Sequence, residues 1–242
     1  MSSQVWLITG ANRGIGFEFV KQLSQRENVT VFATARNPSN AAALNELASK
    51  NTNVHLLQLE STSAADAAAA ATEIEKIAGG LDAVVANAGI ANNWQDITAV
   101  EISSFEEHLQ VNVIGTLILF KAVYPLLLKR QTRKFITIST LAASLKNMLP
   151  VSGTVYGASK VALNWVTKSI HNELGPKGFI AFPMNPGVVD TDMGKHASDT
   201  FGWGEIPLKA PESVAGMLKV IDGATSEQGG RFLSYDGAEL EW

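Results

Sequence analysis

The chain has 242 residues, a formal net charge of −4, 46% hydrophobic and 17% charged residues, and no cysteine. This length suits one large α/β domain or two small ones, and the chain is too apolar to be disordered. The lack of cysteine excludes disulfide scaffolds, thiolate zinc sites and cysteine nucleophiles, and the mild acidity argues against nucleic acid as a partner.

Short β-branched runs alternate with longer segments of helical pattern. Strands are expected at 4–9, 29–34, 53–59, 83–86, 134–139, 180–184 and 231–234, and helices at 15–25, 41–50, 64–78, 104–128, 155–174 and 211–221. Such alternation predicts parallel β-α-β units joined by right-handed crossovers. Because strand 83–86 is apolar throughout, both faces of the sheet are expected to be covered by helices. No Pro/Ser linker divides the chain, so we predict a single domain over residues 1–242.

Neither a targeting segment nor a continuous membrane span is evident, which predicts a cytoplasmic protein without a membrane partner. The first apolar run, at residues 5–8, is too short for a signal peptide. The most apolar stretch, at residues 111–128, is interrupted by Asn112, Lys121 and Pro125, whereas a membrane span needs about 20 mostly apolar residues.

A glycine-rich turn, T-G-A-N-R-G-I-G at residues 9–16, directly follows the first predicted strand. Gly10, Gly14 and Gly16 would let the backbone turn tightly and approach a pyrophosphate, and the next helix would offer unpaired N–H groups and a positive dipole end. The spacing differs from the G-x-G-x-x-G fingerprint, and a purely structural turn is the alternative. Its position between strand and helix favours a doubly wound, Rossmann-type dinucleotide-binding fold with about seven parallel strands.

The end of the second predicted strand indicates which dinucleotide binds. An NAD site usually has Asp or Glu there to bind the ribose 2′-hydroxyl, but this chain has Arg36, and Arg13 lies in the glycine turn. Two guanidinium groups near a ribose favour a 2′-phosphate, and one charge-assisted hydrogen bond contributes about 1.5–3 kcal/mol. Either arginine alone would more often be a solvated surface charge. The missing acid and the pair together predict NADP(H).

Tyr156 and Lys160 lie four residues apart on a predicted helix, so they share one helical face. A phenol has an ordinary pKa of about 10, and a nearby ammonium group lowers it by favouring the phenolate. We therefore expect Lys160 to lower the pKa of Tyr156 and so to make it an acid–base catalyst. Taken alone, this pair is common by chance.

Five motifs in this order resemble the short-chain dehydrogenase/reductase family over nearly the whole chain. They are T-G-x-x-x-G-x-G at 9–16, N-A-G at 87–89, N-V-x-G at 112–115, Y-x-A-S-K at 156–160 and P-G-x-V-x-T at 186–191. Within the family, the ending G-R-F-L-S-Y-D-G at 230–237, followed by Trp242, is similar to carbonyl reductases of the sniffer type and to fungal norsolorinic acid ketoreductases.

The resemblance implies a role for each matching residue. Tyr156 would protonate the carbonyl oxygen, Lys160 would bind the nicotinamide ribose and tune Tyr156, and Asn112 would hold a kinked helix and an ordered water of the proton relay. Glu60 stands where the family usually has an Asp near the adenine. Besides Tyr156 and Lys160, the implied cofactor-binding residues are Gly10, Asn12, Arg13, Gly14, Ile15, Gly16, Arg36, Glu60, Asn87, Ala88, Gly89, Pro186, Gly187, Val189 and Thr191.

One catalytic position departs from the family pattern. The resemblance implies a serine just after the fifth strand, usually the second of a Ser-Ser pair, but here the pair is Ser139-Thr140. Adjacent strand residues point to opposite faces, so only one of them can serve. Alignment of the strand favours Thr140 over Ser139.

Two segments are predicted to form the walls of an apolar substrate pocket. Residues 140–156 make a longer connection than in compact family members, and residues 192–208 combine glycine with aromatic residues, as suits a mobile lid. Residues 90–94 would add a rim, and ordinary loop packing is the alternative. The candidate pocket residues are Ala142, Leu145, Met148, Val151, Val188, Met193, Phe201 and Trp203. No metal-binding cluster is expected, because the four histidines are scattered along the chain.

These observations predict an NADPH-dependent reductase of a bulky, apolar or aromatic ketone or aldehyde, with Tyr156 as the proton donor and Thr140 holding the carbonyl oxygen. The alternatives are a non-redox NADP(H)-binding protein, dehydratase or cyclase on the same scaffold, and an alcohol dehydrogenase that works in the oxidative direction. The resemblance also implies a homodimer or homotetramer. The apolar helices around Leu117 and Trp165 must be buried somewhere, within the chain or between copies.

Overall fold

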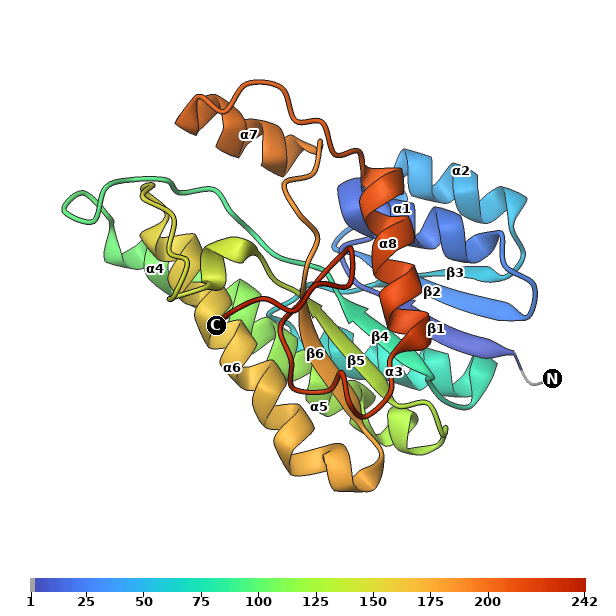
Figure 1. Ribbon diagram of the computed structural model, residues 1–242. Helices are drawn as coiled ribbons and strands as arrows, with labels where there is room; N and C mark the ends of the chain where they lie inside the picture. Colours follow the sequence, from blue (N-terminus) through green and yellow to red (C-terminus); the bar gives the residue numbers. More distant parts are fainter. Residues whose placement is uncertain (1–2) are drawn as a thin grey trace.

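A seven-stranded parallel sheet runs through the computed structural model, which describes residues 3–242 (Figure 1). The strands are β1 (Gln4–Ile8), β2 (Val29–Ala35), β3 (Val54–Gln58), β4 (Ala83–Ala86), β5 (Lys134–Ile138), β6 (Ile180–Asn185) and β7 (Leu233–Ser234). Their order is β3-β2-β1-β4-β5-β6-β7, and every neighbouring pair is parallel. The predicted doubly wound fold and all seven strands are confirmed.

Helices cover both faces of the sheet, as the apolar strands predict. On one face, α1 (Gly14–Ser24), α2 (Ala42–Lys50) and α8 (Ala210–Gly223) contribute to one buried apolar cluster. On the other face, α3 (Ala64–Ala78), α5 (Gly115–Leu128) and α6 (Thr154–Leu174) contribute to a second cluster. The chain starts at β1, moves outward to β3 and then returns to β4 on the other side of β1. In such sheets ligands bind beyond the carboxyl ends of the strands where the order reverses, which here is between β1 and β4.

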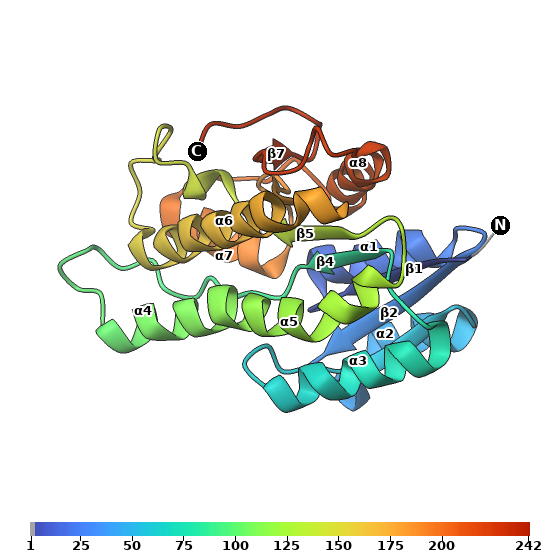
Figure 2. The ribbon, with the colours of Figure 1, turned by 90° about the horizontal axis from the view of Figure 1, so that it is seen from below.

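The predicted helix 104–128 is a composite of three pieces. It consists of α4 (Ile102–Leu109), a π-helical turn (Gln110–Ile114) and α5, and Figure 2 shows α4 and α5 following one another alongside α6. The wide turn has Asn112 at its centre, where the resemblance implied a kink. By length and composition, Ile102–Leu128 could cross a membrane. In this fold it is a core helix, because Leu119 and Val123 are buried in the second apolar cluster.

The expected lid contains a helix that the sequence analysis did not predict. Helix α7 (Asp192–Phe201) begins after Thr191, whose Oγ1 accepts a hydrogen bond from the Gly194 N–H at 3.2 Å. It ends at Gly202, which has a φ of 67°. Figure 1 shows α7 beyond the carboxyl end of β6. The cap residue and the terminal glycine are visible in the sequence, but its glycines and aromatic residues predicted only a mobile lid, without a helix.

Candidate active site

The glycine turn at the start of α1 has the geometry of an anion cradle. Gly10 and Gly14 have φ angles of 62° and 56°, which favour glycine. A Cβ on Gly16 would clash with the Gly10 carbonyl oxygen and would lie 2.5 Å from Nδ2 of Asn87. Within residues 3–242, no side chain caps the start of α1 at Arg13. The first N–H groups of the helix are therefore available to an anion, as a pyrophosphate site requires.

The N-A-G motif connects the loop after β4 to this turn. Nδ2 of Asn87 donates to the carbonyl oxygens of Thr9 and Gly10 at 2.9 and 3.2 Å. The Thr9 hydroxyl in turn accepts from the N–H groups of Asn87 and Ala88, both at 3.0 Å. A Cβ on Gly10 would lie 2.9 Å from Cα of Ala88. These contacts hold the two loops together across the point where the strand order reverses.

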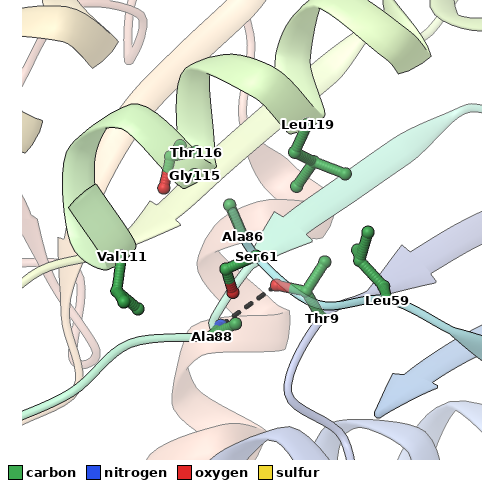
Figure 3. A pocket seen from close by; sticks show the side chains of 9 residues that line it. All are labelled: Thr9, Leu59, Ser61, Ala86, Ala88, Val111, Gly115, Thr116 and Leu119. Atoms are coloured by element: carbon green, nitrogen blue, oxygen red, sulfur yellow. Dashed lines mark hydrogen bonds between the residues drawn. The ribbon is translucent and has the colours of Figure 1, made fainter. Parts of the chain in front are cut away.

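A narrow pocket lies beside this junction (Figure 3). Gly115, the last residue of the N-V-x-G motif, is close-packed there, since a Cβ on it would lie 2.8 Å from the Ser61 carbonyl oxygen. The dashed line in Figure 3 is the hydrogen bond between the Ala88 N–H and the Thr9 hydroxyl. The pocket is lined by Thr9, Leu59, Ser61, Ala86, Ala88, Val111, Gly115, Thr116 and Leu119.

Both candidate phosphate-binding arginines are exposed and paired with acids. Arg36 is 78% exposed, and its Nε lies 3.9 Å from Oε2 of Glu60. Arg13 is 71% exposed, and its Nη1 lies 3.4 Å from Oδ2 of Asp192, the first residue of α7. Exposed pairs of this kind contribute only about 0–1 kcal/mol, so an incoming phosphate can replace them. Neither the pairing of Glu60 with Arg36 nor that of Asp192 with Arg13 is evident from the sequence.

The structure places Thr140, and not Ser139, beside Tyr156. Tyr156 lies in the first turn of α6, and the hydroxyl of Thr140 lies close enough to its phenol to lower the pKa of that group. Ser139 is only 2% exposed, and its hydroxyl donates to Oδ1 of Asn164 at 2.6 Å. The two neighbouring hydroxyls thus have different partners, both of them on α6.

Burial determines the pKa values of Tyr156 and Lys160. The Lys160 ammonium is 4% exposed, donates to the Ile138 carbonyl oxygen at 2.8 Å and lies 5.7 Å from the centre of the Tyr156 ring. Burial raises the pKa of Tyr156 to about 12, although the hydrogen bond from Thr140 acts in the opposite direction, and burial lowers the pKa of Lys160 to about 8. The expectation that Lys160 lowers the pKa of Tyr156 is wrong for this structure, because desolvation of the phenol dominates and the opposing effect comes from Thr140 and not from Lys160. Tyr156 is therefore protonated at neutral pH.

Asn112 connects the π-helical turn to two neighbouring segments. Its side chain, which is fully buried, accepts from the Ile90 N–H at 2.8 Å and donates to the Ile90 carbonyl oxygen at 3.0 Å and to the Ser159 hydroxyl at 2.9 Å. A Cβ on Gly89 would lie 3.0 Å from Oδ1 of Asn112 and 3.4 Å from Nζ of Lys160. The amide group is thus occupied in positioning the loop after β4 and α6, and a water-mediated proton relay stays a prediction.

A set of buried polar contacts, which the sequence analysis missed, sets the register of α6 on β5. Four side chains on successive turns of α6 each pair with β5 or with one of the two residues that follow it. From the far end to the site, the pairs are Thr167 with the Thr137 hydroxyl, Asn164 with Ser139, Lys160 with the Ile138 carbonyl oxygen and Tyr156 with Thr140. This arrangement brings Tyr156 to the carboxyl end of β5.

The P-G-x-V-x-T segment leads from β6 to the glycine turn and the lid. A Cβ on Gly14 would lie 3.4 Å from Cγ2 of Thr191, so the two motifs meet. Gly187 has a φ of 80°, and Val189 is buried. The Pro186 carbonyl oxygen accepts a hydrogen bond from the Ser213 hydroxyl at 2.6 Å. The segment is therefore fixed at its start by α8 and reaches the anion cradle at its end.

The aromatic candidates of the pocket form a row above Tyr156. Trp94 meets the Tyr156 ring edge-on at 5.5 Å and the Phe201 ring edge-on at 5.3 Å, and Phe201 lies 5.1 Å from Trp203. Trp94 is the member that the sequence analysis treated only as part of a rim. Ala142, Val151 and Phe201 are partly buried, whereas Leu145, Met148, Val188, Met193 and Trp203 are at least 40% exposed. In the described part of the chain, no cluster of His, Asp or Glu could hold a metal ion.

Comparisons with known proteins agree with this geometry. The short chain dehydrogenase family model matches residues 4–201. The norsolorinic acid ketoreductase of Aspergillus parasiticus is 36% identical over an alignment of 248 positions that covers 98% of this chain and 91% of that protein. The NADPH-bound carbonyl reductase from chicken fatty liver is 32% identical with a TM-score of 0.91, and the carbonyl reductase Sniffer of Drosophila melanogaster is 30% identical with a TM-score of 0.92. Both structural comparisons cover 100% of each chain.

Proposed function

The chain belongs to the short-chain dehydrogenase family and is an oxidoreductase of that family, and from this premise we propose that it uses NADPH to reduce a bulky, apolar or aromatic ketone or aldehyde. The single observation that carries the proposal is the position of the Tyr156 phenol beside the Thr140 hydroxyl and one helical turn before the buried Lys160 ammonium. A neutral phenol is the form that can give a proton to a carbonyl oxygen.

The residues of the anion cradle fit a dinucleotide. The left-handed glycines, the uncapped start of α1 and Thr191 beside Gly14 would hold the pyrophosphate. The missing acid after β2 and the presence of Arg36 and Arg13 support NADP(H) over NAD(H). The chicken carbonyl reductase, which has NADPH bound, is a structural neighbour. The test is thermal: NADP⁺ should raise the melting temperature more than NAD⁺ at equal concentration, and an equal shift would contradict the assignment.

The side chains divide the work of reduction among them. NADPH supplies the hydride for the carbonyl carbon. The Thr140 hydroxyl orients the carbonyl oxygen, and the Tyr156 phenol donates its proton to that oxygen as negative charge develops on it. Lys160 is mostly charged at neutral pH, because its pKa of about 8 lies above 7. Its ammonium group therefore stabilises the phenolate that Tyr156 becomes after giving up the proton.

Tyr156→Phe tests the assignment of the proton donor. It removes only the hydroxyl, so NADPH should bind with near-normal affinity in a fluorescence titration while turnover falls by a factor of about 100 or more. Near-normal turnover would refute the role of Tyr156. NADPH absorbance, followed over a carbonyl panel with the unmodified protein, distinguishes a reductase from a non-redox protein on this scaffold, which would consume none.

The substrate class is supported by the aromatic row and by one relative. Trp94, Phe201 and Trp203 offer apolar, flat surfaces next to Tyr156. The similar protein from Aspergillus parasiticus is named for a ketone, norsolorinic acid. We propose reduction as the working direction, because a site that selects NADP(H) uses a cofactor that cells usually keep reduced.

We also propose that the protein is a homodimer or homotetramer. Trp165 on α6 is 77% exposed, and Ile114 and Leu117 near the start of α5 are 40% and 41% exposed. A second copy would bury these apolar side chains. Light scattering after gel filtration should show more than one chain per particle, and Trp165→Glu should shift the particle toward a monomer. The cytoplasmic location stays a prediction.

A further inference from the structure

Trp94 is the side chain through which the lid helix contacts Tyr156. It lies on the segment between β4 and α4, where it meets the Tyr156 ring at 5.5 Å and 70° and the Phe201 ring at 5.3 Å and 75°. Phe201 is the last residue of α7. The Trp94 ring therefore stands beside the side chain that a reacting carbonyl must reach.

Two neighbouring segments of the same chain fix the position of the Trp94 segment. The Ser152 hydroxyl donates to Oδ1 of Asp96, which ties the Trp94 segment to the loop before α6. Nδ2 of Asn93 donates to the Ser104 hydroxyl on α4 at 2.9 Å. A Cβ on Gly153 would lie 3.7 Å from the Trp94 ring, so this loop runs directly beside the indole. Trp94 is thus a positioned group and not a loose surface side chain.

The indole N–H of Trp94 is buried, yet it has no hydrogen-bond partner among residues 3–242. Buried polar groups are nearly always paired, and a tryptophan N–H can only donate. The tryptophan ring alone would serve as an apolar wall, which phenylalanine could also provide. An unpaired donor on the ring that contacts Tyr156 therefore points to an acceptor that arrives with a ligand.

We propose that Trp94 is a specificity-determining residue that selects aromatic ketones with a second oxygen on the ring system. Its ring forms a wall against the substrate, on the side where Phe201 now packs, and its N–H donates to the second oxygen while the reacting carbonyl contacts Tyr156 and Thr140. This inference rests on the proposed carbonyl reduction, since it takes Tyr156 as the proton donor. It adds the requirement for an acceptor, which an apolar pocket alone would not impose.

The experiment compares 1-tetralone with its ring-hydroxylated derivatives as substrates, using NADPH and the full chain. Trp94→Phe keeps an aromatic ring but removes the N–H, whereas Trp94→Leu removes the ring as well. Trp94→Phe should lower kcat/KM for at least one hydroxylated tetralone by roughly 5- to 10-fold, mainly through KM, and leave 1-tetralone within about 2-fold of wild type. Trp94→Leu should weaken all of these substrates. Trp165→Phe, the same change on the exposed face of α6, is the matched control and should alter none of them.

Two results would overturn the inference. One is an equal loss on every tetralone in Trp94→Phe, which would mean that the ring only packs, and the other is no loss on any of them. Turnover of 1-tetralone by the variants, together with their melting temperatures and NADPH affinity, shows that they are folded. If wild type consumed NADPH with other carbonyls but with no tetralone, the inference would fail and the proposed function would stand. If no carbonyl were reduced, both would fail.

Discussion

Replacing Lys160 by methionine should relieve a destabilisation that the proposed active site imposes on the fold. Burial lowers the pKa of Lys160 from its ordinary value of 10.5 to about 8, which corresponds to about 3 kcal/mol of destabilisation at pH 7. The unfolded chain binds this proton more tightly, so the wild-type protein gains stability as the pH rises from about 8 to about 10.5. Between pH 7 and about pH 9.5, the gain from this one group is about 2 kcal/mol.

The measurement is urea unfolding of wild type and Lys160→Met at both pH values. The methionine side chain carries no titratable group, so the stability of the variant relative to wild type should fall by about 2 kcal/mol from pH 7 to about pH 9.5. The lost hydrogen bond to the Ile138 carbonyl oxygen costs about 1–3 kcal/mol at both pH values and cancels in this difference. Tyr156→Phe keeps Lys160 and should follow wild type. A difference that is independent of pH would refute the assignment of Lys160 as a desolvated ammonium.

Three further predictions concern the hydroxyl pair, the cofactor and the glycine turn. Thr140→Val should lower kcat/KM by about 100-fold or more, and Thr140→Ser should restore it. Ser139→Ala should mainly lower the unfolding free energy, by about 1–2 kcal/mol, and a larger catalytic loss in Ser139→Ala than in Thr140→Val would reverse the two roles. Glu60→Gln removes the carboxylate that pairs with Arg36. In a fluorescence titration it should raise the affinity for NADPH about 2- to 5-fold and leave the affinity for NADH unchanged. Equal gains for both cofactors would contradict a role of Arg36 in binding the 2′-phosphate. Gly16→Ala should destabilise by about 3 kcal/mol or more in thermal unfolding, whereas Gly223→Ala, with open space around it, should be neutral or stabilising by up to about 1 kcal/mol. Similar melting temperatures for both alanine variants would argue against the close packing at Gly16.

The contrast between Ser139 and Thr140 shows how far local reasoning reaches. Strand alternation implies that only one of the two hydroxyls can face the site, and the structure places Thr140 beside Tyr156 and pairs Ser139 with Asn164. Both partners lie on α6, because β5 ends at Ile138 and the strict alternation ends with it. The pKa of Tyr156 is raised where the sequence led us to expect a lower value, and the reason is equally simple. The spacing of Tyr156 and Lys160 reveals a charge at a suitable helical position, but it does not reveal how much water the fold removes.

Helix α7 and Trp94 illustrate what a one-dimensional pattern leaves out. Thr191 and Gly202 mark the ends of α7 in the sequence, but glycines inside and after the helix weaken its signal. Trp94 is 62 residues before Tyr156 in the chain, and it is a candidate substrate contact only because the fold brings its ring against that of Tyr156. No local pattern predicts a contact between a loop, a lid helix and the start of α6.

The amino-acid sequence was sufficient for the seven strands, the doubly wound fold, the glycine cradle and the Tyr156–Lys160 pair, because each depends on residues that are neighbours along the chain or one helical turn apart. Only the tertiary structure decided the order of the strands, the partner of each hydroxyl, the protonation of Tyr156 and the aromatic contacts of Trp94. These features depend on burial and on contacts between distant segments, and both of them arise only when the helices have packed on the sheet.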